Sequence, residues 1–173
     1  MARGNIVEKE NITFRLNNSL LKNLRINADD EKITVNSLVT KILEDYFEWG
    51  QNAAKAGWMV IPKITMKRFV DGSSEKELEK IAKEMSDHVL EIMMMMSGQY
   101  DLRSFLAMSQ KVAKKSGFDV NIRQDDVTKI VIQHSMGKKW SFFRKVFFEQ
   151  TLNTLGYQNE IKSTPNSLII VIR

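Results

Sequence analysis

The 173-residue sequence contains no cysteine, which excludes disulfide bonds and cysteine-ligated zinc. Its two histidines, His88 and His134, fall on separate expected elements, so we predict no metal site. The longest apolar stretch, near Met93–Met96, is far shorter than the ~20 residues that cross a membrane. The first 16 residues have no apolar segment of the secretory-signal kind. We therefore expect a cytoplasmic protein with no metal and no membrane partner.

The sequence patterns of catalytic sites are also missing. We find no nucleophile–base pair, no glycine-rich phosphate loop and no paired-carboxylate signature. Asp125 and Asp126 are adjacent carboxylates, but their surroundings are typical of a turn. We therefore predict no enzyme activity, no catalytic residue and no cofactor.

The composition is that of a folded protein, and the net positive charge is compatible with a polyanionic partner. Hydrophobic residues make up 43% of the chain and charged residues 27%, which suffices for an ordinary core. The formal net charge is +5, but residues 1–50 carry 7 basic and 8 acidic side chains, and residues 51–173 carry 19 and 13. The basic surplus thus lies in the later part of the chain, so charge alone does not assign a function.

A short strand and a helix are predicted near the start. Residues 11–16 alternate strictly between polar and apolar side chains, which is the period of a half-buried strand. From residue 19 to about 30, apolar side chains recur at helical spacing, after two asparagines that can cap a helix. The apolar residues of the strand are Ile12, Phe14 and Leu16.

A second helix begins after Thr34, whose hydroxyl is a favourable N-cap. It has two adjacent apolar stripes, formed by Leu38, Ile42 and Tyr46 and by Val39, Leu43 and Phe47. A strand and two helices in under 40 residues cannot bury so broad an apolar face alone. We therefore expect a homodimer, in which a second copy covers this face and pairs with the strand.

Residues 10–48 resemble the ribbon–helix–helix family of Arc and MetJ. The resemblance depends on the strand Asn-Ile-Thr-Phe-Arg-Leu, the short first helix and the Val-Asn-Ser step that opens the second helix. It implies that the strands of two subunits pair antiparallel and enter the major groove of double-stranded DNA. With the apolar side chains turned inward, the base-contacting residues would be Asn11, Thr13 and Arg15.

The same resemblance places the start of the second helix near the DNA backbone. Free amides around Thr34, Val35 and Asn36, with the helix dipole behind them, would bind phosphate. Lys9 and Arg3 would add mobile phosphate contacts, which set register rather than sequence preference.

Residues 58–173 resemble no family that we recognise, and their pattern predicts a separate α/β domain. The order is a strand in 58–69, two helices, a hairpin, a helix over 141–155 and two final strands. This order suggests a split β-α-β unit and a ferredoxin-like sandwich with an extra strand. We predict domains at 1–49 and 58–173, joined by a linker or frayed helix end at 50–57.

The segment from His134 to Trp140 joins a strand end to a helix start. Gly137, Lys138 and Lys139, together with His134, could bind a ligand or an anion there through free amides and positive charge. The alternative is a plain connecting loop with solvated lysines.

These patterns together predict a sequence-specific DNA-binding transcription regulator, a repressor acting as a homodimer or a tetramer. Its second domain would join dimers together or sense a small-molecule effector. Two alternatives remain open. One is an antitoxin-type module that binds a protein, and the other is a ligand-binding or enzymatic α/β domain whose N-terminal segment only dimerises.

Overall fold

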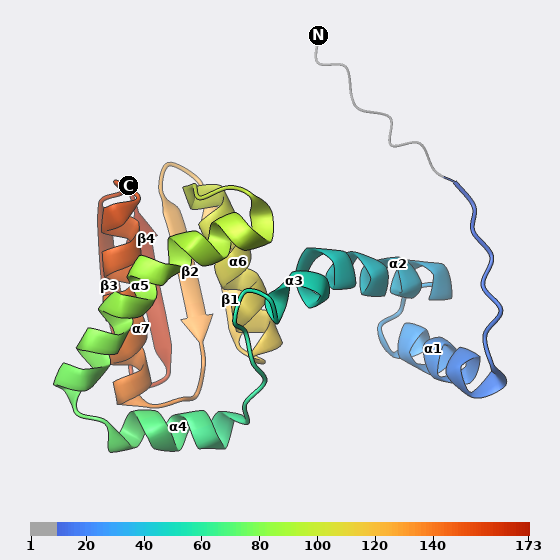
Figure 1. The fold of residues 1–173 in the computed structure, drawn as a ribbon, viewed down its shortest axis with the longest axis horizontal. Coiled ribbons are helices and arrows are strands. Elements are labelled where there is room, and N and C mark those ends of the chain that lie inside the picture. The colour runs from blue at the N-terminus through green and yellow to red at the C-terminus, as the bar shows by residue number, and fades with distance from the viewer. Residues whose placement is uncertain (1–9) are drawn as a thin grey trace, which may run out of the picture. The chain divides into compact units, whose positions relative to one another are not determined.

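A computed structural model describes residues 10–173 of the chain. The chain divides into two compact units, Met1–Glu48 and Trp49–Arg173 (Figure 1). No helix in residues 10–173 has both the length and the hydropathy needed to cross a bilayer.

The first unit contains the two helices expected from the sequence, α1 (Asn18–Asp30) and α2 (Val35–Asp45). Asn17 caps α1, since its side chain accepts a hydrogen bond from the Leu20 amide at 2.8 Å. In the same way Thr34 caps α2 by accepting from the Ser37 amide at 3.1 Å. Both helix starts are therefore determined by side chains next to them in the sequence.

The segment at residues 11–16, which the sequence predicts as a strand, does not form one. Residues 11–16 have no regular secondary structure, and Ile12 and Phe14 remain 75% and 52% exposed. A strand forms only when its backbone groups have a neighbouring strand to bond to, and the described chain offers this segment none. The ribbon of the ribbon–helix–helix fold is thus not present in the single chain.

The core of the first unit is small. Leu24, Ala28 and Leu38 are buried, and a few partly buried side chains pack around them. Most of the apolar side chains outside this cluster stay exposed, namely Leu20, Ile26, Ile42, Leu43, Tyr46 and Phe47. The broad apolar face expected on α2 is therefore uncovered.

Residues 46–57 continue into the second unit. A π-helical turn, η1 (Tyr46–Gly50), is followed by the short helix α3 (Gln51–Ala53). Ala53 is buried, and the rings of Trp49 and Trp58 pack 5.3 Å apart. The stretch expected as a linker thus contains a helical turn and side chains packed into the second unit.

The second unit contains a four-stranded sheet in the order β1-β2-β4-β3, with all neighbours antiparallel. The strands β2 and β3 run parallel with β4 between them, so β2, α7 and β3 form a split β-α-β unit. The strands are β1 (Asp119–Gln124), β2 (Thr128–Gln133), β3 (Asn159–Thr164) and β4 (Ser167–Ile172), and the helices are α4 (Lys63–Gly72), α5 (Glu75–Ser97), α6 (Leu102–Lys115) and α7 (Lys138–Thr154).

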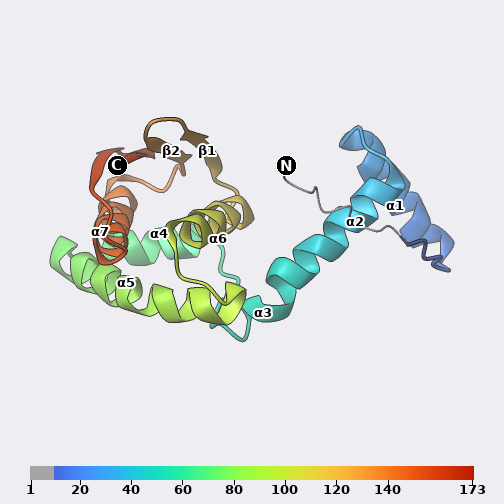
Figure 2. The same cartoon turned by 90° about the horizontal axis from the view of Figure 1, so that it is seen from above.

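The helices lie on one face of this sheet. The helices α6 and α7 lie next to the strands, and α5 packs on the side of α7 away from them (Figure 2). Alternate residues of β4 are buried, including Leu168 and Ile170, and they meet Phe147 and Phe148 of α7 in one core. The α/β class of the second unit, the hairpin and the final strand pair are therefore confirmed.

The strand predicted within 58–69 is wrong. Helix α4 begins after Pro62, and Met66 and Val70, one helical turn apart, pack against the core. This period of apolar contact outweighs the β-branched content that suggested a strand. The sheet therefore has no strand within residues 10–118, and the expected ferredoxin-like sandwich lacks its first strand.

Candidate functional site

The three residues predicted to contact bases lie close together in the segment before α1. Asn11, Thr13 and Arg15 are all exposed, and α1 and α2 of the same unit do not cover them. The apolar residues between them are exposed as well, so a single chain leaves both faces of the segment free. Which face turns inward depends on what packs against it.

The predicted phosphate contacts cluster at the start of α2. The Thr34 hydroxyl caps the helix and lies 2.8 Å from the Ser37 hydroxyl, and Asn36 is exposed in the first turn. The first amides of a helix have no intrahelical acceptor, so those of Val35 and Asn36 are the ones available to an anion. Lys9 and Arg3 lie outside the described residues.

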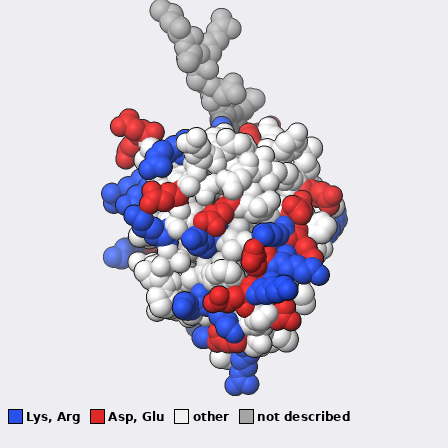
Figure 3. All heavy atoms as spheres, turned by 90° about the vertical axis from the view of Figure 1, so that its left-hand side faces the viewer, with Lys and Arg blue, Asp and Glu red and all other residues white. Residues whose placement is uncertain are grey.

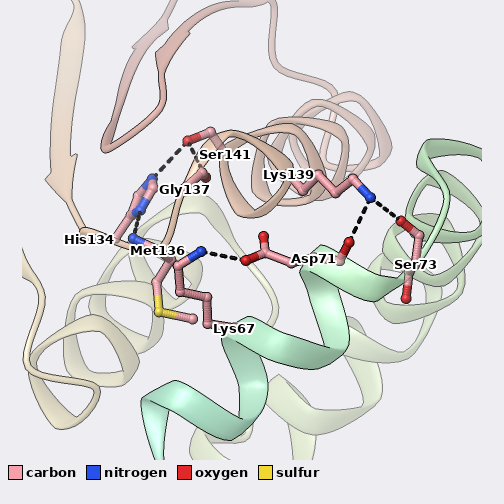
Figure 4. Close-up of polar contacts among 8 residues, drawn as sticks. All are labelled: Lys67, Asp71, Ser73, His134, Met136, Gly137, Lys139 and Ser141. Atoms are coloured by element: carbon pink, nitrogen blue, oxygen red, sulfur yellow. Dashed lines mark hydrogen bonds and ion pairs between the residues drawn. The ribbon is translucent and has the colours of Figure 1, made fainter.

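The structure gives His134 a buried position at the end of β2. The His134 side chain is 2% exposed, and Nδ1 accepts a hydrogen bond from the Met136 amide at 3.1 Å. Nε2 lies 3.0 Å from the Ser141 hydroxyl (Figure 4). This hydroxyl donates to the Thr164 carbonyl at 2.6 Å. Since Nδ1 accepts, the proton of the neutral ring belongs on Nε2.

Burial, together with the smaller effect of the positive charge of Arg144, lowers the pKa of His134 to about 4. The ring is therefore neutral near pH 7. It ties the end of β2 to α7 and to the turn between β3 and β4, which is a structural role.

The lysines beside it differ in their contacts. The Lys139 ammonium donates to the carbonyls of Asp71 and Ser73 at 2.8 and 2.6 Å, at the end of α4. Lys138 is exposed. Gly137 has φ +93, and a Cβ there would lie 3.3 Å from the ammonium of Lys67. As an anion site this loop would thus use Lys138 and backbone amides, and it stays a prediction.

Lys67 and Asp71 of α4 lie against the same loop and were not predicted from the sequence. Their side chains form an ion pair at 2.5 Å (Figure 4). The Asp71 carboxylate already places a negative charge near the first turn of α7, where a free anion would otherwise be attracted. This ion pair was not expected from the sequence, because it depends on residues 63–72 being a helix rather than a strand.

A cavity of about 180 Å³ lies within the second unit, among α5, α6, α7 and residues 56–58. Arg144 is the charged side chain that lines it. The sequence contained a signal for this position: Arg144 is spaced three and four residues from Ser141 and Phe148, both buried on α7. A charged residue on the buried face of a helix is rare without a partner or a function.

Trp58 also lines the cavity. Its indole Nε1 is buried and has no hydrogen-bond acceptor among the described residues. Burying such a donor without a partner costs about 1–3 kcal/mol. The Trp58 indole therefore supplies this cavity with an unused N–H donor.

The basic side chains on one face of the molecule do not form a separate patch (Figure 3). Figure 3 shows Lys and Arg side chains interspersed with Asp and Glu on the face that it draws. Several of these charges are paired within helices, for example Lys83 with Glu79 at 2.6 Å and Lys145 with Glu149 at 3.6 Å.

The sequence matches no family model and no curated protein.

Proposed function

We propose that the chain is a sequence-specific DNA-binding transcription regulator that acts as a homodimer. The observation that carries this proposal is the exposed apolar surface of the first unit. Phe14 and Phe47 are 52% and 63% exposed, and the segment before α1 has a strand pattern but no strand to pair with. A second copy would supply both the missing strand and an apolar cover.

The resemblance to the ribbon–helix–helix family agrees with this arrangement, because α1 and α2 occupy the expected residues. In the dimer, Ile12, Phe14 and Leu16 would turn toward the helices. The alternate side chains would then project from the ribbon, where Arg15 can donate two hydrogen bonds to guanine. Asn11 can pair with adenine, and Thr13 can contact the methyl group of thymine.

The start of α2 would hold the DNA backbone, through the amides of Val35 and Asn36 next to Thr34. Such contacts fix the register of the ribbon in the groove. We expect the protein to repress transcription by covering its operator. The second unit would join two dimers into a tetramer or respond to a small-molecule effector.

Selection of bound sequences from random double-stranded DNA by the full chain tests the proposal. We expect a palindromic site, since a two-fold dimer has two identical ribbon strands. Arg15→Ala should weaken binding to that site by about 1–3 kcal/mol and relax the preference at one base pair of each half-site.

Arg123→Ala, which removes an exposed arginine from β1, is the matched control and should leave the selected site unchanged. Failure to enrich any sequence would contradict the proposal. So would an Arg15→Ala protein that selects the same site with the same affinity. A mass equal to one 20.0 kDa chain under the binding conditions would contradict the dimer.

A further inference from the structure

The cavity in the second unit combines an apolar wall with one positive charge. The helices that surround it, α5, α6 and α7, can be followed in Figure 2. The hydroxyl of Ser109 and the side chains of Arg144 and Trp58 are the polar groups of its lining. The larger apolar side chains of the lining are Met85, Val89, Ile92, Met108, Val112 and Phe147.

Arg144 has no acidic partner. No ion pair or hydrogen bond to its guanidinium occurs within residues 10–173, and its contacts are with rings. The guanidinium carbon lies 4.6 Å from the Phe147 ring centre and 4.8 Å from that of Phe148. These rings hold the guanidinium in place, but they accept none of its N–H groups in the way an anion would.

The guanidinium is charged despite its surroundings. Burial lowers the pKa of Arg144 to about 10, so the group keeps its proton at neutral pH. The Arg144 side chain is half-buried against the apolar lining. A charge withdrawn from water in this way is normally compensated by an opposite charge with which it forms hydrogen bonds. No described residue supplies an anion to the Arg144 guanidinium. The indole N–H of Trp58 is a further donor at this cavity, and it is buried without an acceptor.

We propose that this cavity binds a small monocarboxylic acid whose apolar part is about the size of one aromatic ring. The guanidinium fork matches a carboxylate, with two parallel hydrogen bonds. One positive charge matches one negative charge. The thioether, aliphatic and aromatic lining fits an apolar body and disfavours strongly hydrated inorganic anions. The size follows from the volume, because an apolar cavity of about 150 Å³ accommodates benzene.

Titration calorimetry with the full chain tests this proposal. The probes are benzoate, phenylacetate and isovalerate, each compared with its neutral amide. We expect saturable binding of one ligand per chain for at least one acid, and at least about tenfold weaker binding of the corresponding amide, which has no charge for Arg144 to bind. Absence of saturable binding by all three acids would overturn the proposal, and so would equal affinity for an acid and its amide.

Two variants locate the site. Arg144→Met keeps the length and the apolar stem of the side chain but removes the charge, and it should lower the affinity for the acid at least about tenfold. Arg103→Met, at an exposed position of α6, is the matched control and should bind as the original chain does. Unchanged affinity in Arg144→Met would overturn the proposal.

Val112→Phe gives an independent check in case Arg144→Met fails to fold, since it keeps Arg144 and fills the cavity. Binding should be lost in this variant while its circular dichroism spectrum and cooperative unfolding persist. Unchanged binding would place the ligand elsewhere and overturn the proposal.

This inference goes beyond the proposed function and does not depend on it. The calorimetric experiment contains no DNA, so its failure would leave the operator selection unaffected. A regulator that binds an acid in this cavity would have a small-molecule effector, which the proposed function leaves unidentified.

Discussion

His134 is a buried polar side chain of the second unit and Arg144 is a half-buried one, and the two differ in their hydrogen-bond partners. Both ring nitrogens of His134 have partners, so the neutral ring is fully satisfied. Arg144 is charged and has aromatic neighbours but no acceptor among residues 10–173. A buried ring with partners for both nitrogens is typical of a structural residue. A charged group with unused N–H donors beside a cavity is what a ligand-binding residue requires.

The burial of His134 predicts a dependence of stability on pH. The pKa of His134 is about 4 in the folded protein, against the ordinary value of 6.5. As the pH falls below 6.5, the unfolded chain binds a proton that the folded chain does not bind. Stability is therefore fully present above pH 6.5 and is lost as the pH falls toward 4. The loss amounts to about 3 kcal/mol.

Urea denaturation at several pH values between 7.5 and 4 measures this loss. His134→Gln should remove it, so that its free energy of unfolding changes less over this range. His88→Gln is the matched control, because the side chain of His88 is 70% exposed. The explanation would be wrong if His134→Gln showed the same pH dependence as the original chain.

At the scale of elements, residues 11–16 have the sequence pattern of a strand but form no strand in the single chain. Their strict alternation is a strand pattern, but a strand needs a neighbour, and the described chain supplies none. The helices α1 and α2 need no neighbouring strand, since their backbone hydrogen bonds and caps are local and they pack against each other.

Two neighbouring substitutions test whether the segment becomes a dimer ribbon. Phe14→Asp places a charge on the side that would turn inward, so it should give a monomer and abolish DNA binding. Thr13→Asp places the same charge on the other side, so it should keep the dimer and weaken DNA binding by repelling phosphate. Sedimentation equilibrium and DNA titration measure the two effects.

Unfolding of the second unit should be the same in both variants and serves as the control. If Thr13→Asp broke the dimer and Phe14→Asp left it intact, the assignment of faces would be reversed. If neither variant changed the mass, the segment would have no part in the dimer interface.

The helix α4 shows where a local pattern misleads. Residues 58–69 are rich in β-formers and contain a proline, which together suggested one strand or a bent pair. The proline instead precedes the helix, where its missing amide costs nothing. The contacts of Met66 and Val70 with a core built largely from later residues decide the outcome.

At the scale of the whole molecule, the net charge of +5 is unevenly distributed along the chain. If DNA binding depends on the first unit, only a few cations contact phosphate, chiefly Arg3 and Lys9 of each subunit. Four such cations in a dimer would make the logarithm of affinity fall against the logarithm of salt with a slope of about −4. Titrations between 50 and 300 mM salt measure this slope.

The double variant Arg3→Ala and Lys9→Ala should bring this slope close to zero while the preferred site stays the same. Lys22→Ala and Arg25→Ala, exposed on α1, form the matched control. An unchanged steep slope in the double variant would assign the phosphate contacts to other residues, including the basic surplus of residues 51–173. Affinity independent of salt would contradict binding to the DNA backbone altogether.

Local chemistry in the sequence was enough to predict most of the elements. The caps Asn17 and Thr34 mark the starts of α1 and α2, because each binds an amide only three residues away. The hairpin and the final strand pair follow from alternation and turn residues at short range. These features depend on neighbours in the sequence, so they can be recognised without knowing the fold.

The tertiary structure alone decided which polar groups are satisfied. From the sequence, His134 belonged either to a ligand- or anion-binding loop or to a plain connecting loop, and contacts with Ser141 of α7 make it a buried structural residue. The sequence of α7 shows only that Arg144 is three and four residues from Ser141 and Phe148. The packing of α5, α6 and α7 shows that Arg144 lines a cavity and has no acidic partner among the described residues. The physical reason is that burial and pairing are set by residues far apart in the sequence, which no local pattern records.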